Sequence, residues 1–152
     1  MRYISGLVFL IVVAYLTWPY VQVYRLDKAA QNNDLTTLTK LVDLESVRRI
    51  HKEVLERNIR AVVGPQDNVF SDIIREGTRI FGNTAVNTVV DIEWVQSRLQ
   101  ADPNHSLIQD MTFAFFESPT RFTIRIGELG RNPVHVQMIL QDWIWRVVAI
   151  YE

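Results

Sequence analysis

The pattern of apolar and polar positions divides the chain into three parts. An apolar run without a charged residue, YISGLVFLIVVAYLTWPY, occupies residues 3–20. Helical periodicity follows as far as residue 101, and from residue 110 onward apolar and polar positions alternate as they do in β-strands. This order predicts an α+β protein, in which a transmembrane helix is followed by helices packed on a C-terminal antiparallel β-meander of about four strands.

Residues 3–20 predict a membrane anchor, because roughly 20 apolar residues cross the hydrocarbon core of a bilayer as a helix. Aromatic rings, which favour the membrane–water interface, stand near its two ends: Tyr3, Tyr15, Trp18 and Tyr20. A cleaved signal peptide is the alternative, but it needs small residues where this chain has bulky aromatics. A buried core helix is the third interpretation, although a core rarely requires so many consecutive apolar positions. We therefore expect an uncleaved anchor.

The charges that flank the run orient it only weakly. Arg2 precedes it, and Arg25 and Lys28 follow with Asp27 between them. Because the head before the run is so short, we expect an uncleaved signal that sends the domain out of the cytoplasm. The predicted location is the bacterial inner membrane, with a single pass and a periplasmic domain. The absence of cysteine excludes disulfides and cysteine metal sites but suits either side of the membrane.

We expect two units: the anchor, 1–20, and a single α+β domain, 21–152, with a helical half, 21–101, and a β-sheet half, 110–152. About 130 residues remain without the anchor, enough for one domain with its own core. The formal net charge is −1, and acidic and basic residues are interspersed. No basic surface for nucleic acid is expected.

The helical half contains recognisable helix starts. Pro19 suits a first helical turn, so the anchor and a helix over 20–32 are expected to form one kinked rod. The expected caps and helices are Asp34 for 35–41, Asp43 for 44–62, Asn68 for a helix over 70–81 that 84–90 extends, and Asp91 for 92–100.

In the sheet half, short breaks separate the expected strands, and such short connections favour an antiparallel meander. The expected strands are 110–116, 120–128, 133–141 and 143–151. One face should meet the helices, and the other should carry Arg125, His135, Gln137, Trp145, Val147 and Tyr151. Helices that close over a curved sheet suggest a cone-like, nuclear-transport-factor-2/cystatin-like architecture.

Several positions resemble a known family. They are Pro19-Tyr20, Tyr24, Leu26, Ala29, Asp34, Leu38, Val42-Asp43, Arg48, 91–95, Phe116-Glu117-Ser118, Arg121-Phe122 and Trp145-Arg146-Val147. This pattern resembles DUF2939, a family of short membrane-anchored bacterial proteins known as a domain of unknown function. The resemblance implies helices followed by an antiparallel sheet and no specific activity. The chain departs from the family pattern at Asp142-Trp143, where a glycine turn is usual.

The helix over 44–62 has polar side chains on its apolar face, with His51 and Asn58 near the centre and Arg48 at the edge. Buried polar groups are usually hydrogen-bonded, so the simplest interpretation is a satisfied core histidine and asparagine. The alternative is a pocket between this helix and the sheet. Its expected ligand-binding residues are Arg48, His51, Asn58, Trp94 and Arg125.

The tryptophans of the last strand suggest a second kind of site. Trp143 and Trp145 share parity, so on a regular strand they face the same side. Such residues are more often core. If the core lies on the opposite face, however, they form with Tyr151 an exposed interaction surface for a partner.

The sequence contains no nucleophile elbow, phosphate loop, dinucleotide fingerprint or paired-histidine motif. We therefore expect no catalytic residue, cofactor or metal site. The predicted function is a non-enzymatic membrane-anchored accessory or assembly protein, such as a subunit of a larger membrane complex. We expect it to bind the bilayer through residues 3–20, and to bind another membrane or envelope protein, or itself. The alternative is a binding module for a small apolar or amphipathic ligand. An enzyme with His51 as general base is the least expected.

Overall fold

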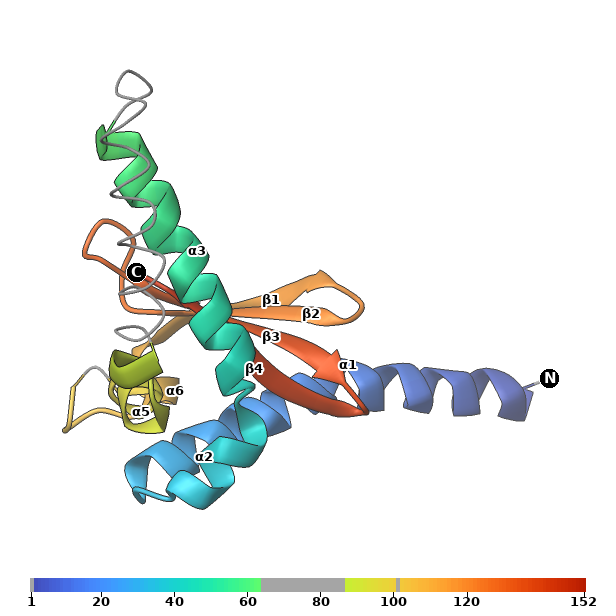
Figure 1. The fold of residues 1–152 in the computed structure, drawn as a ribbon. Coiled ribbons are helices and arrows are strands. Elements are labelled where there is room, and N and C mark those ends of the chain that lie inside the picture. The colour runs from blue at the N-terminus through green and yellow to red at the C-terminus, as the bar shows by residue number, and fades with distance from the viewer. Residues whose placement is uncertain (1, 64–86, 101) are drawn as a thin grey trace.

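The computed structural model describes residues 2–63, 87–100 and 102–152. Within these residues helices come first and a sheet follows, which confirms the α+β class (Figure 1). The helix expected after Asn68 lies outside the described residues, as do residues 84–86 of its expected continuation, whereas residues 87–89 are helical.

The first helix, α1 (Arg2–Gln31), runs without interruption from the apolar run into the domain. Pro19 lies inside it rather than at its start. The side chain of Thr17 bonds the carbonyls of Val13 and Ala14 in the turn before Pro19, at 3.0 and 3.1 Å. The expected boundary between residues 20 and 21 therefore falls within one continuous helix.

The next helices begin where the sequence predicts. They are α2 (Leu35–Leu41), α3 (Leu44–Val63) and α5 (Ile92–Leu99). Asp34, Asp43 and Asp91 each accept a hydrogen bond from the backbone three residues later, at 3.0, 3.1 and 2.7 Å. A short helix that was not predicted, α6 (Leu107–Asp110), follows, and a capping box at Ser106 marks its start.

The strands form the predicted meander. They are β1 (Met111–Ser118), β2 (Arg121–Ile126), β3 (Val134–Gln141) and β4 (Ile144–Tyr151), in the order β1-β2-β3-β4 with every neighbouring pair antiparallel. The parallel contact of Val42 with Val147 ties the start of α3 to β4.

One hydrophobic core joins the C-terminal half of α1 to the sheet. Its fully or almost fully buried members include Val23, Leu26, Ala29, Leu38, Leu99, Phe122, Ile124, Val136, Met138, Trp145 and Val147. Phe116, Phe122 and Trp145 pack edge-to-face, with ring centroids 5.1 to 6.3 Å apart. Polar side chains fasten the helices around this core: the carboxylate of Asp27, which is 3% exposed, accepts a 2.9 Å hydrogen bond from the backbone N–H of Leu107.

The predicted outer face of β4 is wrong for Trp145 and Val147, both of which are fully buried. Val147 pairs with Met138, but Ala149 pairs with the adjacent Gln137, so Val148 is an extra residue in β4. This β-bulge reverses the parity of the strand. Tyr151 therefore lies on the outer face opposite His135, whereas Trp145 faces the core although it has the same parity.

Candidate functional site

The N-terminal half of α1 is an exposed apolar rod. Its large side chains from Tyr3 to Val13 are 39 to 93% exposed, whereas Val23 and Leu26 are buried. Within the described parts of the chain, α1 is the one helix long and apolar enough to cross a membrane. A signal sequence near the N-terminus would have the same properties.

Three of the predicted interfacial aromatics contact the sheet. The Tyr15 hydroxyl donates to the carbonyl of Pro119, and its ring stacks on Phe116 with centroids 6.2 Å apart. The Trp18 ring stacks on Trp143 at 6.3 Å and an interplanar angle of 15°. The Tyr20 hydroxyl donates to the carbonyl of Ala114 at 3.0 Å. Tyr3, at the far end of α1, is 93% exposed.

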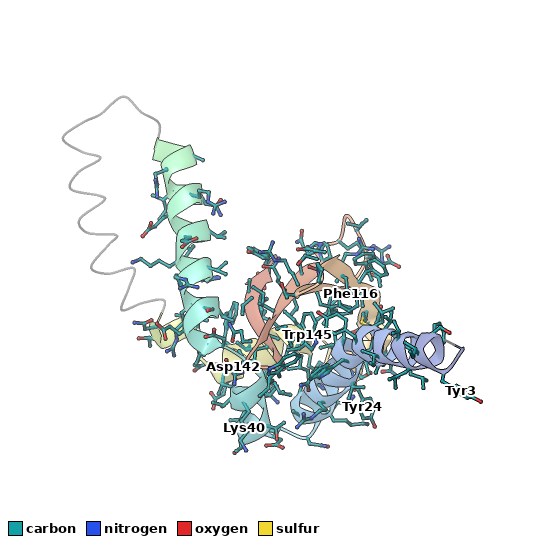
Figure 2. The ribbon with its side chains drawn as sticks, turned by 90° about the vertical axis from the view of Figure 1, so that its right-hand side faces the viewer. Tyr3, Tyr24, Lys40, Phe116, Asp142 and Trp145 are labelled. Atoms are coloured by element: carbon teal, nitrogen blue, oxygen red, sulfur yellow. The ribbon has the colours of Figure 1, made fainter. Side chains whose placement is uncertain are left out.

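The turns that Tyr15 and Trp18 contact are the tips of two hairpins. We call Pro119-Thr120, between β1 and β2, and Asp142-Trp143, between β3 and β4, the hairpin tips. Both hairpins point along α1 toward its N-terminal end (Figure 1). Figure 2 views the molecule from this side, with Phe116, Trp145 and Asp142 across the end of the sheet.

The second hairpin tip has an unusual backbone. Asp142 and Trp143 have φ angles of 48° and 63°. A two-residue hairpin turn with two positive φ angles is type I′, which normally uses Asn or Gly. Trp143 therefore lies in the turn, and its parity with Trp145 does not place both side chains on one face. Trp143 is 73% exposed but Trp145 is fully buried, so the two do not form the exposed patch that the sequence suggested.

Two of the predicted ligand-binding residues meet between α3 and α5. The His51 ring lies edge-on to Trp94 at 5.3 Å, and the Arg98 guanidinium lies 5.3 Å from the Trp94 ring centre. Arg98 also forms an ion pair with Glu152 at 2.5 Å. We call His51, Trp94, Arg98 and Glu152 the Trp94 cluster. Arg98 and Glu152 were missed because only the tertiary fold brings the last residue of the chain to α5.

The Trp94 cluster favours a neutral imidazole. Burial lowers the pKa of His51 below 6.5, and Arg98 lowers it further, while Glu152 acts in the opposite direction. The Nε of Arg98 is buried and has no hydrogen-bond partner within the described segments. This N–H is a donor that a bound acceptor could use.

The other predicted ligand-binding residues lie elsewhere. Arg48 donates from Nε to the carbonyl of Val90 at 2.7 Å, which fastens α3 to the start of α5. Asn58 is exposed in the C-terminal half of α3. Arg125 lies over the Phe113 ring and donates to Thr112 at 3.0 Å on the outer sheet face. The described residues therefore do not unite the five in one pocket.

Two cavities lie away from the Trp94 cluster. One of about 250 Å³ on the outer sheet face is lined by Glu117, Thr123, His135, Val136, Gln137 and Tyr151. The other, about 480 Å³, is an open polar groove where the end of α1 meets Gln100 and residues 103–109, and it includes Lys28, Gln31 and His105. Side chains from distant segments build both, so no local sequence pattern indicates them.

The described segments contain no group of three or more histidine or acidic side chains that could hold a metal ion. His51 lies on α3, His105 precedes α6, and His135 lies on β3. His105 contacts Asp110 at 3.1 Å on the surface.

Fold and apolar helix together define an α+β protein with an N-terminal helix able to span a membrane. The model of the family "Protein of unknown function (DUF2939)" matches residues 8–97, and the chain belongs to this family. The match covers α1 to α5, whereas the resemblance in the sheet, at Phe116-Glu117-Ser118 and Trp145-Arg146-Val147, lies beyond it. None of the curated proteins and none of the solved structures matches the chain. The cone-like architecture therefore stays a prediction.

Proposed function

We propose that this protein is a membrane-anchored, non-enzymatic accessory or assembly protein, which acts by binding another membrane or envelope protein or a second copy of itself. The observation that carries the proposal is the division of α1. Its first half exposes apolar side chains and its second half lies in the domain core. Exposed apolar surface of this extent is stable in water only when lipid or protein covers it.

Contacts of the helix with the sheet favour retention of the anchor. Cleavage of a signal peptide near Pro19 would remove Tyr15 and Trp18, which pack on Phe116 and Trp143. The proposed location is the inner membrane of a bacterium, with one pass and the domain in the periplasm.

Membrane fractionation of two matched variants tests the anchor. Leu10 and Leu129 are similarly exposed, 64% and 69%, but only Leu10 lies in the apolar run. An arginine near the centre of a spanning helix costs about 2.5–3.5 kcal/mol of insertion free energy. Leu10→Arg should therefore reduce the amount of full-length chain that resists alkaline extraction, and Leu129→Arg should leave it unchanged. Equal extraction of both variants, or an intact mass that lacks residues 2–18, would count against the anchor.

Cross-linking in native membranes tests the interaction. The full-length protein should be captured with a second envelope protein or a second copy, and the adduct should survive mild detergent. Recovery of nothing but monomer under these conditions would contradict the proposal.

The Trp94 cluster favours a second candidate, a binding module for a small amphipathic ligand. The buried Nε of Arg98 would donate to the polar end, and the Trp94 ring would contact the apolar end. Titration with octanoate should change the fluorescence of the wild-type protein but not of Trp94→Phe. No response in either protein would contradict this candidate.

A further inference from the structure

We infer that both hairpin tips lie in the headgroup region of the bilayer, so that the domain contacts lipid at a second place besides the anchor. This inference rests on the proposed anchor. The partner is a lipid surface, and it is identified by the length of the exposed side of α1, by the packing on its other side and by the chemistry of the tips.

The exposed apolar side of α1 continues beyond the start of the domain. Leu16, Val21 and Tyr24 are 48 to 56% exposed. At about 1.5 Å per residue, the rise from Tyr3 to Tyr24 is roughly 32 Å, close to the ~30 Å of a hydrocarbon core. Arg25 follows at once, and the ammonium of Lys28 lies 5.6 Å from the Tyr24 ring centre. The side of α1 turned away from the domain therefore has the length and the charged end of a membrane span.

The opposite side of the same segment carries the sheet. Contacts with the domain begin at Tyr15, which bonds Pro119, and continue at Trp18, which stacks on Trp143. Tyr15 precedes Tyr24 by roughly 14 Å along the helix. Both tips thus lie beside a part of α1 whose other side faces lipid. Tilting of α1 or local thinning of the bilayer would bring the hairpin tips to the depth of the headgroups.

The tips have the chemistry of a membrane interface. Trp143 is 73% exposed, and tryptophan is favoured at this depth because its ring is amphipathic. Pro119 has no N–H to satisfy, and its carbonyl already accepts the Tyr15 hydroxyl. Phe115, near the first tip, is 59% exposed, and the exposed Arg121 can reach phosphate with its long side chain. Asp142 is exposed beside Trp143 and would remain in headgroup water.

Single-cysteine labelling tests this arrangement in the full-length chain, because the protein has no cysteine of its own. A nitrobenzoxadiazole label is placed at Thr120→Cys on a tip, at Leu10→Cys in the anchor and at Leu129→Cys in the loop between β2 and β3. That loop lies at the opposite end of the sheet (Figure 1). Each protein is reconstituted into phosphatidylcholine–phosphatidylglycerol vesicles, and quenching by an acyl-chain nitroxide lipid is compared with quenching by iodide.

The expected result is that the nitroxide lipid quenches the labels at residues 10 and 120 several-fold more strongly than the label at residue 129, while iodide shows the reverse order. Iodide quenching at residue 120 with lipid quenching at residue 10 would overturn the tip contact and leave the anchor intact. Protection of residue 120 from both quenchers would also overturn it, because protein would then cover the tip. Iodide quenching at residue 10 would show that the anchor itself has failed.

Discussion

Trp143 occupies a backbone position that costs free energy. Its φ of 63° lies in the left-handed region, where a residue with a side chain is destabilised by about 1–2 kcal/mol relative to a right-handed conformation. Glycine avoids most of this cost. The exposed tryptophan in this turn is consistent with a role that compensates for the strain, such as contact with Trp18 and lipid.

We therefore expect the free energy of unfolding of Trp143→Gly in detergent to exceed that of Trp143→Ala by about 0.5–1 kcal/mol, because both lose the Trp18 stack and only glycine relieves the backbone. Urea unfolding followed by circular dichroism measures it. Trp143→Ala is the control, because it removes the same ring without relieving the backbone. If both substitutions destabilise equally, the backbone strain is not significant.

His51 should make stability depend on pH. Burial, the largest cause, holds its pKa in the folded protein below 6.5. The unfolded chain therefore binds a proton at higher pH than the folded one, and this contribution to stability is lost as the pH falls from about 6.5 toward the folded pKa. His51→Gln should show a smaller loss between pH 7.5 and pH 5.5 in urea unfolding.

The outer-face variant His135→Gln serves as the control, because it leaves His51 and the Trp94 cluster in place. It should keep the wild-type loss of stability over the same pH interval. An unchanged pH dependence in His51→Gln would contradict the assignment to His51.

At the scale of elements, Asp27 connects α1 to α6 through the backbone N–H of Leu107. Asp27→Ala should lower the free energy of unfolding by about 1–3 kcal/mol, because a buried N–H would lose its acceptor. Asp27→Asn retains an acceptor oxygen and should lose less. The exposed Glu53 on α3 is the control, since Glu53→Ala should change stability by no more than about 0.5 kcal/mol. Equal effects of Asp27→Ala and Glu53→Ala would contradict a structural role for this bond.

Local sequence signals predicted the elements well where one residue determines the start. Asp34, Asp43 and Asp91 could be recognised as helix caps, because the cap needs only a side-chain oxygen that accepts a hydrogen bond from the backbone N–H three residues later. The faces of β4 could not be predicted. The extra residue at Val148 is defined only by pairing with β3, so alternation read from Tyr151 placed Trp145 on the wrong side.

The whole-molecule arrangement was partly accessible from sequence. Continuity of the apolar run with the helix after it was predicted from the helical pattern around Pro19, and α1 confirms it. The contacts of Tyr15 and Trp18 with the hairpins, and of Glu152 with Arg98, join segments that lie far apart in the sequence. The sequence contains no periodicity that relates such distant positions, so these parts of the candidate sites required the fold.

The two halves of α1 should respond differently to truncation. Deletion of 2–14 removes only the exposed part of the apolar run and retains Tyr15, Trp18 and the whole buried half. Deletion of 2–30 also removes Val23, Leu26, Ala29 and Ala30 from the core. Loss of one buried leucine side chain alone costs about 2–5 kcal/mol. A typical domain has only about 5–15 kcal/mol of stability, so the longer deletion should abolish folding.

Circular dichroism and urea unfolding in mild detergent distinguish the two outcomes. The shorter deletion should retain a cooperative unfolding transition although it no longer fractionates with membranes, and the longer one should lose the transition. A cooperative transition in both would show that the C-terminal half of α1 is dispensable for the core. Loss of folding in both would show that the exposed run stabilises the domain, and α1 would then be a single structural element rather than an anchor joined to a core helix.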